Sequence, residues 1–191
     1  MIRFCKITFA ALFFCPVIFI SCKTKSQSAN KNIAAPAIVS DSVLYHFKHY
    51  FNNALPTPKN YVSDYDNLFT PQQEDSLNDL INLFEKQTTN QIAIVSFDTA
   101  MVTKQNFEEL TLRLGNAWGV GDKNKKNGIL IGICAGYKKI RIQNGKGIEK
   151  ILSDSATKNI IDSNFIPYYK KADYYSGTLN GVKAIIQKLH Q

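Results

Sequence analysis

The chain has 191 residues, with 23 Lys and Arg against 15 Asp and Glu, which gives a formal net charge of +8. This length suits a single domain with a sizeable core. The basic excess is mild and scattered, whereas a nucleic-acid-binding protein needs a basic stripe with interleaved aromatic residues, so we expect no nucleic-acid partner. Solvation, or contact with anionic lipid or envelope polymers, is the better interpretation of the lysines.

The first 21 residues follow the three-part plan of a secretory signal. Arg3 and Lys6 precede an apolar run from Ile7 to Ile20, and Cys22 follows shortly after it. A membrane-spanning helix needs about 20 unbroken apolar residues, and this run is shorter and contains a proline. We therefore predict that residues 1–21 are a signal peptide that is removed after export.

The end of this segment resembles a bacterial lipobox, in which a cysteine receives a diacylglyceryl group before cleavage: Phe19, Ile20, Ser21 and Cys22. Phe19 stands where Leu is usual, and the alternative is an ordinary secretory signal with a chance cysteine. We predict that Cys22 is lipidated and anchors the protein to a membrane of the cell envelope, outside the cytoplasm. Lys23 favours the outer membrane, because an Asp there signals inner-membrane retention in some bacteria.

Residues 22–59 are expected to form the lipidated start, a flexible tether and a lead-in to the domain. From Lys23 to Ser42 the composition is polar with little apolar content, which cannot offset the entropy of ordering. The aromatic stretch Tyr45–Phe51 contains His46 and His49, which are spaced to ligate a metal from one helical face. No further ligand stands nearby at a suitable spacing, so aromatic packing is the favoured interpretation.

The domain is expected to occupy residues 60–191. Thr70 is predicted to cap its first helix, because Pro71 stands at the first helical position and Gln73 completes a capping box. Apolar residues continue this helix at helical spacing: Leu77, Leu80, Ile81 and Phe84. A second helix is predicted from Lys104 to Trp118, with Gly119 ending it.

Three segments are predicted to be strands. Gln91–Phe97 and Ile129–Cys134 are apolar and β-branched, and the helix between them makes a parallel crossover unit. After a tight turn, apolar and polar residues alternate in Lys139–Gln143, which indicates an antiparallel hairpin. A helix capped by Ser153 or Asp154 and a last helix from about Gly177 complete an α/β domain.

Nucleophilic catalysis finds little support in the sequence. No Ser or Cys has the setting of a nucleophile elbow, and the histidines lie in the lead-in or at His190. Cys134 is predicted to be a core residue of an apolar strand. Because Cys22 is expected to be lipidated, we predict no internal disulfide.

Carboxylates are the better candidates for a site. Neither the segment that begins at Asp64 nor the one that begins at Asp122 completes a calcium loop, so oxygen ligands would have to come from separate loops. In an antiparallel hairpin the start of the first strand lies beside the end of the second. We therefore predict one acidic rim formed by Asp122, Glu149 and Asp154, with Asp64 joining from the entry segment. The alternative is that all four are helix caps and solvated charges.

A series of motifs resembles the TPM domain family, also called the TPM phosphatase family, which includes thylakoid lumen proteins, photosystem II repair factors and bacterial envelope proteins. The resemblance runs from Tyr61 to Leu189, and its order and spacing are specific. Its pieces are Tyr61, Val62, Ser63 and Asp64 before Leu68; Trp118, Gly119, Val120 and Gly121 before Asn127 and Gly128; Ile129–Ile133; Gly145, Lys146, Gly147, Ile148 and Glu149; Leu152, Ser153 and Asp154; and Pro167, Asp173, Tyr174 and Gly177.

The resemblance implies an α/β sandwich, and together with the predicted elements it indicates three α/β/α layers around a central mixed sheet of about four strands. It further implies a rim that binds calcium or a similar cation in some members, and acid phosphatase activity, as reported for a plant relative. Asp64, Asp122, Glu149 and Asp154 lie on or beside the family motifs, whereas Asp66 stands where the family more often has a small residue. Many bacterial relatives add a membrane helix and a glycine-rich tail, whereas this chain stops at Gln191, so the lipid on Cys22 is expected to take over anchoring.

Two functions from different classes remain open. The protein is either an envelope lipoprotein whose calcium-holding rim binds a partner in the upkeep of membrane proteins, or a metal-assisted phosphomonoesterase in which the cation polarises a phosphoryl oxygen and activates water. We favour the binding module, because no nucleophile is placed for phosphoryl transfer.

Overall fold

A computed structural model describes residues 55–190 of the chain. The predicted signal peptide, the lipidation site Cys22, the tether, and the stretch Tyr45–Phe51 with its two histidines all lie outside the described residues. Within residues 55–190, no helix combines the length and the apolar character that crossing a bilayer requires.

A four-stranded sheet lies at the centre of the described domain, in the order β1-β2-β3-β4. β1 pairs with β2 in parallel, β2 pairs with β3 in parallel, and β3 pairs with β4 in an antiparallel hairpin. The predicted mixed sheet, the parallel crossover and the hairpin are confirmed. The strands are β1 (Val62–Asp64), β2 (Gln91–Ser96), β3 (Gly128–Cys134) and β4 (Lys139–Asn144).

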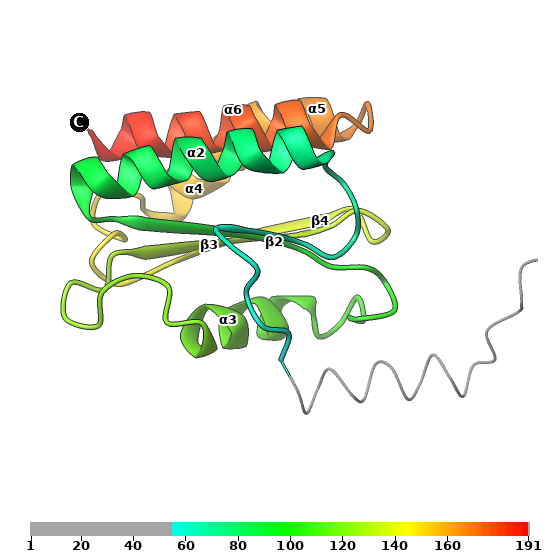
Figure 1. Ribbon diagram of the computed structural model, residues 1–191, viewed down its shortest axis with the longest axis horizontal. Coiled ribbons are helices and arrows are strands. Elements are labelled where there is room, and N and C mark those ends of the chain that lie inside the picture. The colour runs from blue at the N-terminus through cyan, green and yellow to red at the C-terminus, as the bar shows by residue number, and fades with distance from the viewer. Residues whose placement is uncertain (1–54, 191) are drawn as a thin grey trace, which may run out of the picture. The chain divides into compact units, whose positions relative to one another are not determined.

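Helices cover both faces of the sheet, as Figure 1 shows, with α3 alone on one face. Because side chains alternate along a strand, Ile92 and Ile94 of β2 pack toward one face and Val95 toward the other. Two separate cores result, and the predicted three-layer sandwich is confirmed. The helical segments are α2 (Pro71–Thr88), α3 (Phe107–Ala117), α4 (Asp154–Ile160), the π-helical turn η1 (Ile161–Phe165), α5 (Ile166–Tyr169) and α6 (Tyr174–Leu189).

Helix α2 begins as the sequence predicts. The Thr70 hydroxyl accepts from the Gln73 amide at 3.3 Å, and the Gln73 side chain accepts from the Thr70 amide at 2.9 Å. This reciprocal pair satisfies two amide groups that the first turn leaves free. Leu77, Ile81 and Phe84 are the buried residues of the helix, at helical spacing on one side.

Helix α3 begins three residues later than predicted. Thr103 and Asn106 exchange side-chain-to-backbone hydrogen bonds of 2.7 and 3.1 Å, which hold residues 103–106 in a separate turn before Phe107. The helix ends before Gly119, whose φ of +63° is the left-handed conformation that glycine adopts without strain.

The C-terminal helices differ from prediction at one boundary and in one turn. Ser153 caps α4, as predicted, but α6 begins at Tyr174 rather than near Gly177, because the Asp173 side chain accepts from the Ser176 amide at 3.0 Å. The wide π turn η1 stands directly before Ile166 and Pro167. Proline has no N–H to offer to a regular helical turn, which fits a widened turn at this place.

Candidate functional site

The sheet has two chemically different edges. The parallel strands end at Asp64, Ser96 and Cys134, and the β3–β4 turn lies at the same edge, which we call the carboxyl edge. The loops before β3 and after β4 lie at the opposite edge, which we call the amino edge. In α/β sheets, ligands usually bind outside the carboxyl ends of the strands.

The structure does not bring the four predicted rim residues together. Asp122 and Glu149 line one cavity of about 440 Å³ at the amino edge, as the hairpin argument predicts. Asp154 lies in the first turn of α4 and is not among the residues that line this cavity. Asp64 lies at the carboxyl edge, roughly 17 Å away at about 3.3 Å per residue along β2.

Asp64 therefore lies apart from Asp122 and Glu149. No strand was predicted between the start of the domain at residue 60 and Thr70, whereas residues Val62–Asp64 form a strand parallel to β2. A parallel strand carries its last residue to the edge where its neighbour also ends, so Asp64 lies beside Ser96.

Asp122 forms a turn at the amino edge. Its Oδ1 accepts from the amides of Asn124 and Lys125 at 2.9 and 2.8 Å, and these bonds hold the pKa of the carboxyl below its usual value. The same cavity is lined by Lys123, Lys126 and Lys146. Asp122 thus fits the alternative prediction, in which the acidic residues cap local backbone turns or are solvated charges.

Asp64 has a structural role at the carboxyl edge. The residue is 3% exposed, and its carboxylate accepts from the Ser96 hydroxyl and from the Phe69 amide, the latter at 2.9 Å. The Ser96 hydroxyl accepts in turn from the amides of Tyr65 and Asp66, at 2.8 and 2.9 Å. These bonds fix the segment that leads from β1 to α2.

Asp66 is the most perturbed carboxyl group of the carboxyl edge. Burial raises its pKa to about 6, and the neighbouring carboxylates of Asp98 and Asp64 add to the rise, while the Ala135 amide donates to the carboxylate and opposes it. Asp98 follows β2 and accepts from the Ala100 amide at 2.6 Å. We call Asp64, Asp66 and Asp98 the carboxylate cluster.

Asp98 is not among the residues predicted from the sequence, and the sequence predicted no role for Asp66. Asp98 stands two residues beyond β2, and the rule that ligands gather past the carboxyl ends of strands would have identified it. Asp66 follows β1 in the same way once β1 is recognised as a strand.

Oxygen ligands of this kind suit a hard divalent cation, and a cation would offset both the burial and the carboxylate repulsion that raise the pKa of Asp66. The cluster is not a ready-made cage, however. Across residues 55–190, no three His, Cys, Asp or Glu side chains converge closely enough to hold a metal by themselves. A bound cation would take backbone carbonyls and water as further ligands, as calcium commonly does.

Cys134, at the end of β3, is fully buried within the core beneath α3, which confirms its predicted role as a core residue. Burial raises the pKa of its thiol, and the carboxylates of Asp66 and Asp98 raise it further. A thiol held in the protonated form is a poor nucleophile.

Comparison with known proteins supports the assignment of the fold. The family model for the TPM domain matches residues 62–188. The comparison with curated proteins found no match.

Three solved structures are similar to this chain. The N-terminal domain of a protein from P. gingivalis is 29% identical, with a TM-score of 0.61 over 68% of this chain and 81% of that one. The BA42 protein of the psychrophilic bacterium Bizionia argentinensis is 18% identical, with a TM-score of 0.56 over 65% and 83%. The N-terminal domain of the cg2496 protein from Corynebacterium glutamicum is 13% identical, with a TM-score of 0.52 over 70% and 82%. The last two likenesses concern the fold alone.

Proposed function

The chain belongs to the TPM domain family, and we propose that it is a calcium-binding module of the cell envelope that acts in the binding or upkeep of membrane proteins. The observation that carries the proposal is the half-buried carboxyl group of Asp66 at the carboxyl edge, close enough to Asp64 and Asp98 to feel their charges, where burial raises its pKa. Such a group gains from a nearby cation, which removes the cost of holding its charge.

Calcium is the cation that the site suits best. The cluster offers carboxylate oxygens from irregular segments after β1 and β2, and calcium tolerates a looser and higher coordination than the strict octahedron of magnesium. In this proposal Asp66 and Asp98 bind the ion directly. Asp64, which is already bonded to Ser96 and Phe69, positions the loop behind them.

The test is thermal unfolding of the purified protein in calcium and in chelator. Calcium should stabilise the parent by about 2.7 kcal/mol at a hundred times the dissociation constant, if the unfolded chain does not bind it. Replacing Asp98 by Ala should abolish this gain, whereas replacing Asp122 by Ala, at the amino edge, should leave it intact. If only Asp122→Ala lost the stabilisation by calcium, the ion would bind at the amino edge instead. Equal midpoints for the parent in both conditions would refute cation binding.

Membrane attachment through the lipid on Cys22 is part of the same proposal. It rests on the lipobox-like segment that ends at this cysteine and on the signal-like run before it. A single acyl chain binds a membrane only marginally, and lipoprotein processing supplies further chains.

The enzymatic alternative is a metal-assisted phosphomonoesterase. The hydroxyl of Ser96 lies in the cluster, but it is fully buried and is engaged with Asp64, Tyr65 and Asp66, so it is not free to attack a substrate. We therefore keep the binding module. Turnover of a generic phosphate ester that is lost in Asp98→Ala, but retained in the surface variant Lys183→Glu, would reverse this preference.

A further inference from the structure

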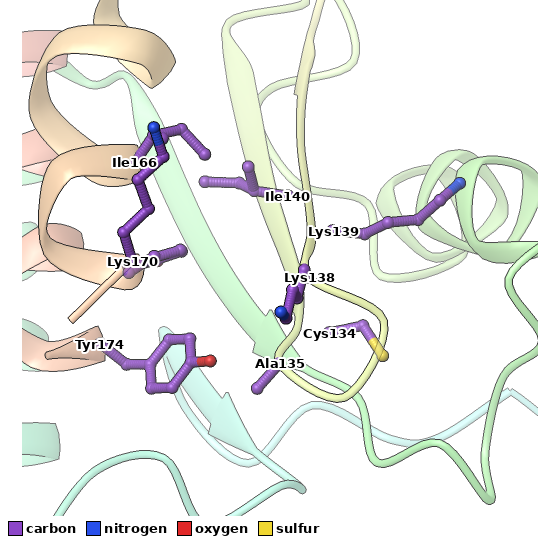
Figure 2. Close-up of a pocket in the computed structure, with 9 residues that line it drawn as sticks. Cys134, Ala135, Lys138, Lys139, Ile140, Ile166, Lys170 and Tyr174 are labelled. Atoms are coloured by element: carbon purple, nitrogen blue, oxygen red, sulfur yellow. The ribbon is translucent and has the colours of Figure 1, made fainter. Parts of the chain in front are cut away.

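A cavity of about 320 Å³ opens between the β3–β4 hairpin and the C-terminal helices. The side chains of Ile140, Ile166, Tyr169 and Tyr174 supply its apolar wall. Figure 2 shows Ile140 and Ile166 directed toward one another across the gap, with Tyr174 and Ala135 below them. The cavity has the size and the lining of a small-molecule site.

The aromatic part of the wall is packed against neighbouring side chains. The rings of Tyr169 and Tyr174 lie 4.9 Å apart, and the Tyr169 ring meets Phe165 edge-on at 5.9 Å. The Tyr169 hydroxyl is bonded to Thr178 at 2.7 Å, which locks this ring onto α6. A wall that is already packed loses little freedom when a ligand binds.

Two ammonium groups stand at this cavity without a partner. Lys138 and Lys170 both line it, and neither forms an ion pair with any group in residues 55–190. Lys139 lines it as well, but Figure 2 shows its side chain directed away, toward α3, where it pairs with Glu108 at 3.4 Å. No acidic residue is among the lining residues.

The backbone of Lys138 has a left-handed conformation, which is unusual for lysine. Residues Ala135–Lys138 form a turn closed by a 2.9 Å bond from the Lys138 amide to the Ala135 carbonyl, and Lys138 has a φ of +52°. Glycine or asparagine is the usual residue at a left-handed position in a hairpin. A lysine there places a charge beside an apolar cavity at the expense of local strain.

A further donor completes the site. The Tyr174 hydroxyl has no hydrogen-bond partner within the described part of the chain, and Figure 2 shows it directed across the cavity toward Ala135. The cavity thus combines an apolar wall with two ammonium groups and a tyrosine hydroxyl, and no acidic side chain lines it. This combination suits a ligand with an apolar body and an anionic head.

We propose that this cavity binds a small amphiphilic organic anion, with its apolar body against Ile140, Ile166 and the tyrosine rings and its head between Lys138 and Lys170. Liquid water occupies about 30 Å³ per molecule, so the volume holds roughly ten non-hydrogen atoms. A single short alkyl or aryl group with a carboxylate or phosphate head has this size. The inference does not depend on the cation site.

The test uses octanoate, which has ten non-hydrogen atoms, on the purified full-length protein in the presence of chelator. Nuclear magnetic resonance titration should show shifts of the amide signals around the cavity, at concentrations below micelle formation. Acetate has the head without the body and 1-octanol has the body without the charge. Each should bind at least tenfold more weakly than octanoate.

Charge-reversal variants distinguish binding in the cavity from attraction by the overall positive charge of the chain. The double variant Lys138→Glu with Lys170→Glu should lose octanoate affinity at least tenfold. The matched double variant Lys150→Glu with Lys183→Glu makes the same change in net charge at exposed positions outside the cavity and should bind like the parent. Equal losses in both pairs would mean attraction by net charge alone and would overturn the proposal.

A steric variant gives an independent check. Replacing Ile166 by Trp should fill the cavity and abolish binding while both lysines remain, and circular dichroism should show that the fold is unchanged. If that variant is unfolded, the comparison of the two double charge-reversal variants decides the outcome. Binding to vesicles of anionic phospholipid without any binding of octanoate would identify the lysines as a membrane-contact surface and would refute a cavity site.

Discussion

Replacing Asp66 by Asn should stabilise the protein in the absence of calcium. The pKa of Asp66 rises from the ordinary 3.8 to about 6, so near neutral pH the folded state holds a charge that its surroundings disfavour. Each pKa unit corresponds to about 1.4 kcal/mol, which sets an upper limit of about 3 kcal/mol. Because the group is in partial contact with water, we expect a gain of about 1–2 kcal/mol.

The dependence on pH identifies the cause. A raised carboxyl pKa means that the folded state keeps its proton when the unfolded state has lost it, so the parent loses stability as pH rises from about 4 to about 6. Above pH 6 both states are ionised and the penalty is constant. Asparagine has no such titration, so the stability of the variant relative to the parent should increase across this window and then level off.

Urea unfolding in chelator at pH 4, 5, 6 and 7 measures this difference. Asp79→Asn, at an exposed position on α2, is the matched control and should give no increase. Calcium should then stabilise the parent but not Asp66→Asn, so the order of stability reverses when calcium replaces chelator. A difference that does not vary with pH, or an Asn variant less stable than the parent at pH 7, would refute the electrostatic reasoning.

Further substitutions test separate parts of the protein. Asp64→Ala should cost about 2–4 kcal/mol in urea unfolding, because it leaves the buried Ser96 hydroxyl and Phe69 amide without their acceptor, and an unchanged midpoint would contradict this role. Gly181→Ala should cost about 1–2 kcal/mol, because the new Cβ would lie 2.0 Å from the Phe165 ring, whereas at Gly115 the nearest atom is 3.6 Å away and the same change should be neutral or stabilising. Cys22→Ser should release the protein into the soluble fraction of cells, and continued membrane retention would count against lipidation.

Local signals explain which elements of the fold could be predicted. The Thr70 cap depends on residues three apart, and the sequence alone contains it. The start of α3 depends on a bonded pair, Thr103 and Asn106, that competes with the first helical turn. The start of α6 at Tyr174, three residues earlier than predicted, depends on Asp173 acting as a cap. Gly177 is required within this first turn, because a Cβ would lie 2.7 Å from the Tyr169 ring.

The site was harder to predict, because it depends on the direction of one short strand. The antiparallel pairing of β3 and β4 brings Asp122 and Glu149 to one cavity, as predicted, but leaves Asp154 outside it. That pairing says nothing about β1, whose three residues pair with β2 far along the chain. Three residues carry too little periodicity to distinguish a strand from an extended lead-in. The carboxylate cluster and the apolar cavity both lie at the edge that this pairing defines.

Ala135 connects the two proposed sites. Its amide donates to the Asp66 carboxylate, and the same residue lines the apolar cavity beneath Lys138. A cation at the cluster and an anionic head in the cavity would attract one another across this residue, and thermodynamic linkage requires each to raise the affinity of the other by the same factor. A coupling of about 1 kcal/mol, or roughly fivefold, is the scale expected for charges near a protein surface. Octanoate titrations in calcium and in chelator measure this factor, and in Asp98→Ala the affinities in the two conditions should be equal. Equal octanoate affinities in the two conditions, for a parent that binds both ligands, would show that the sites act independently.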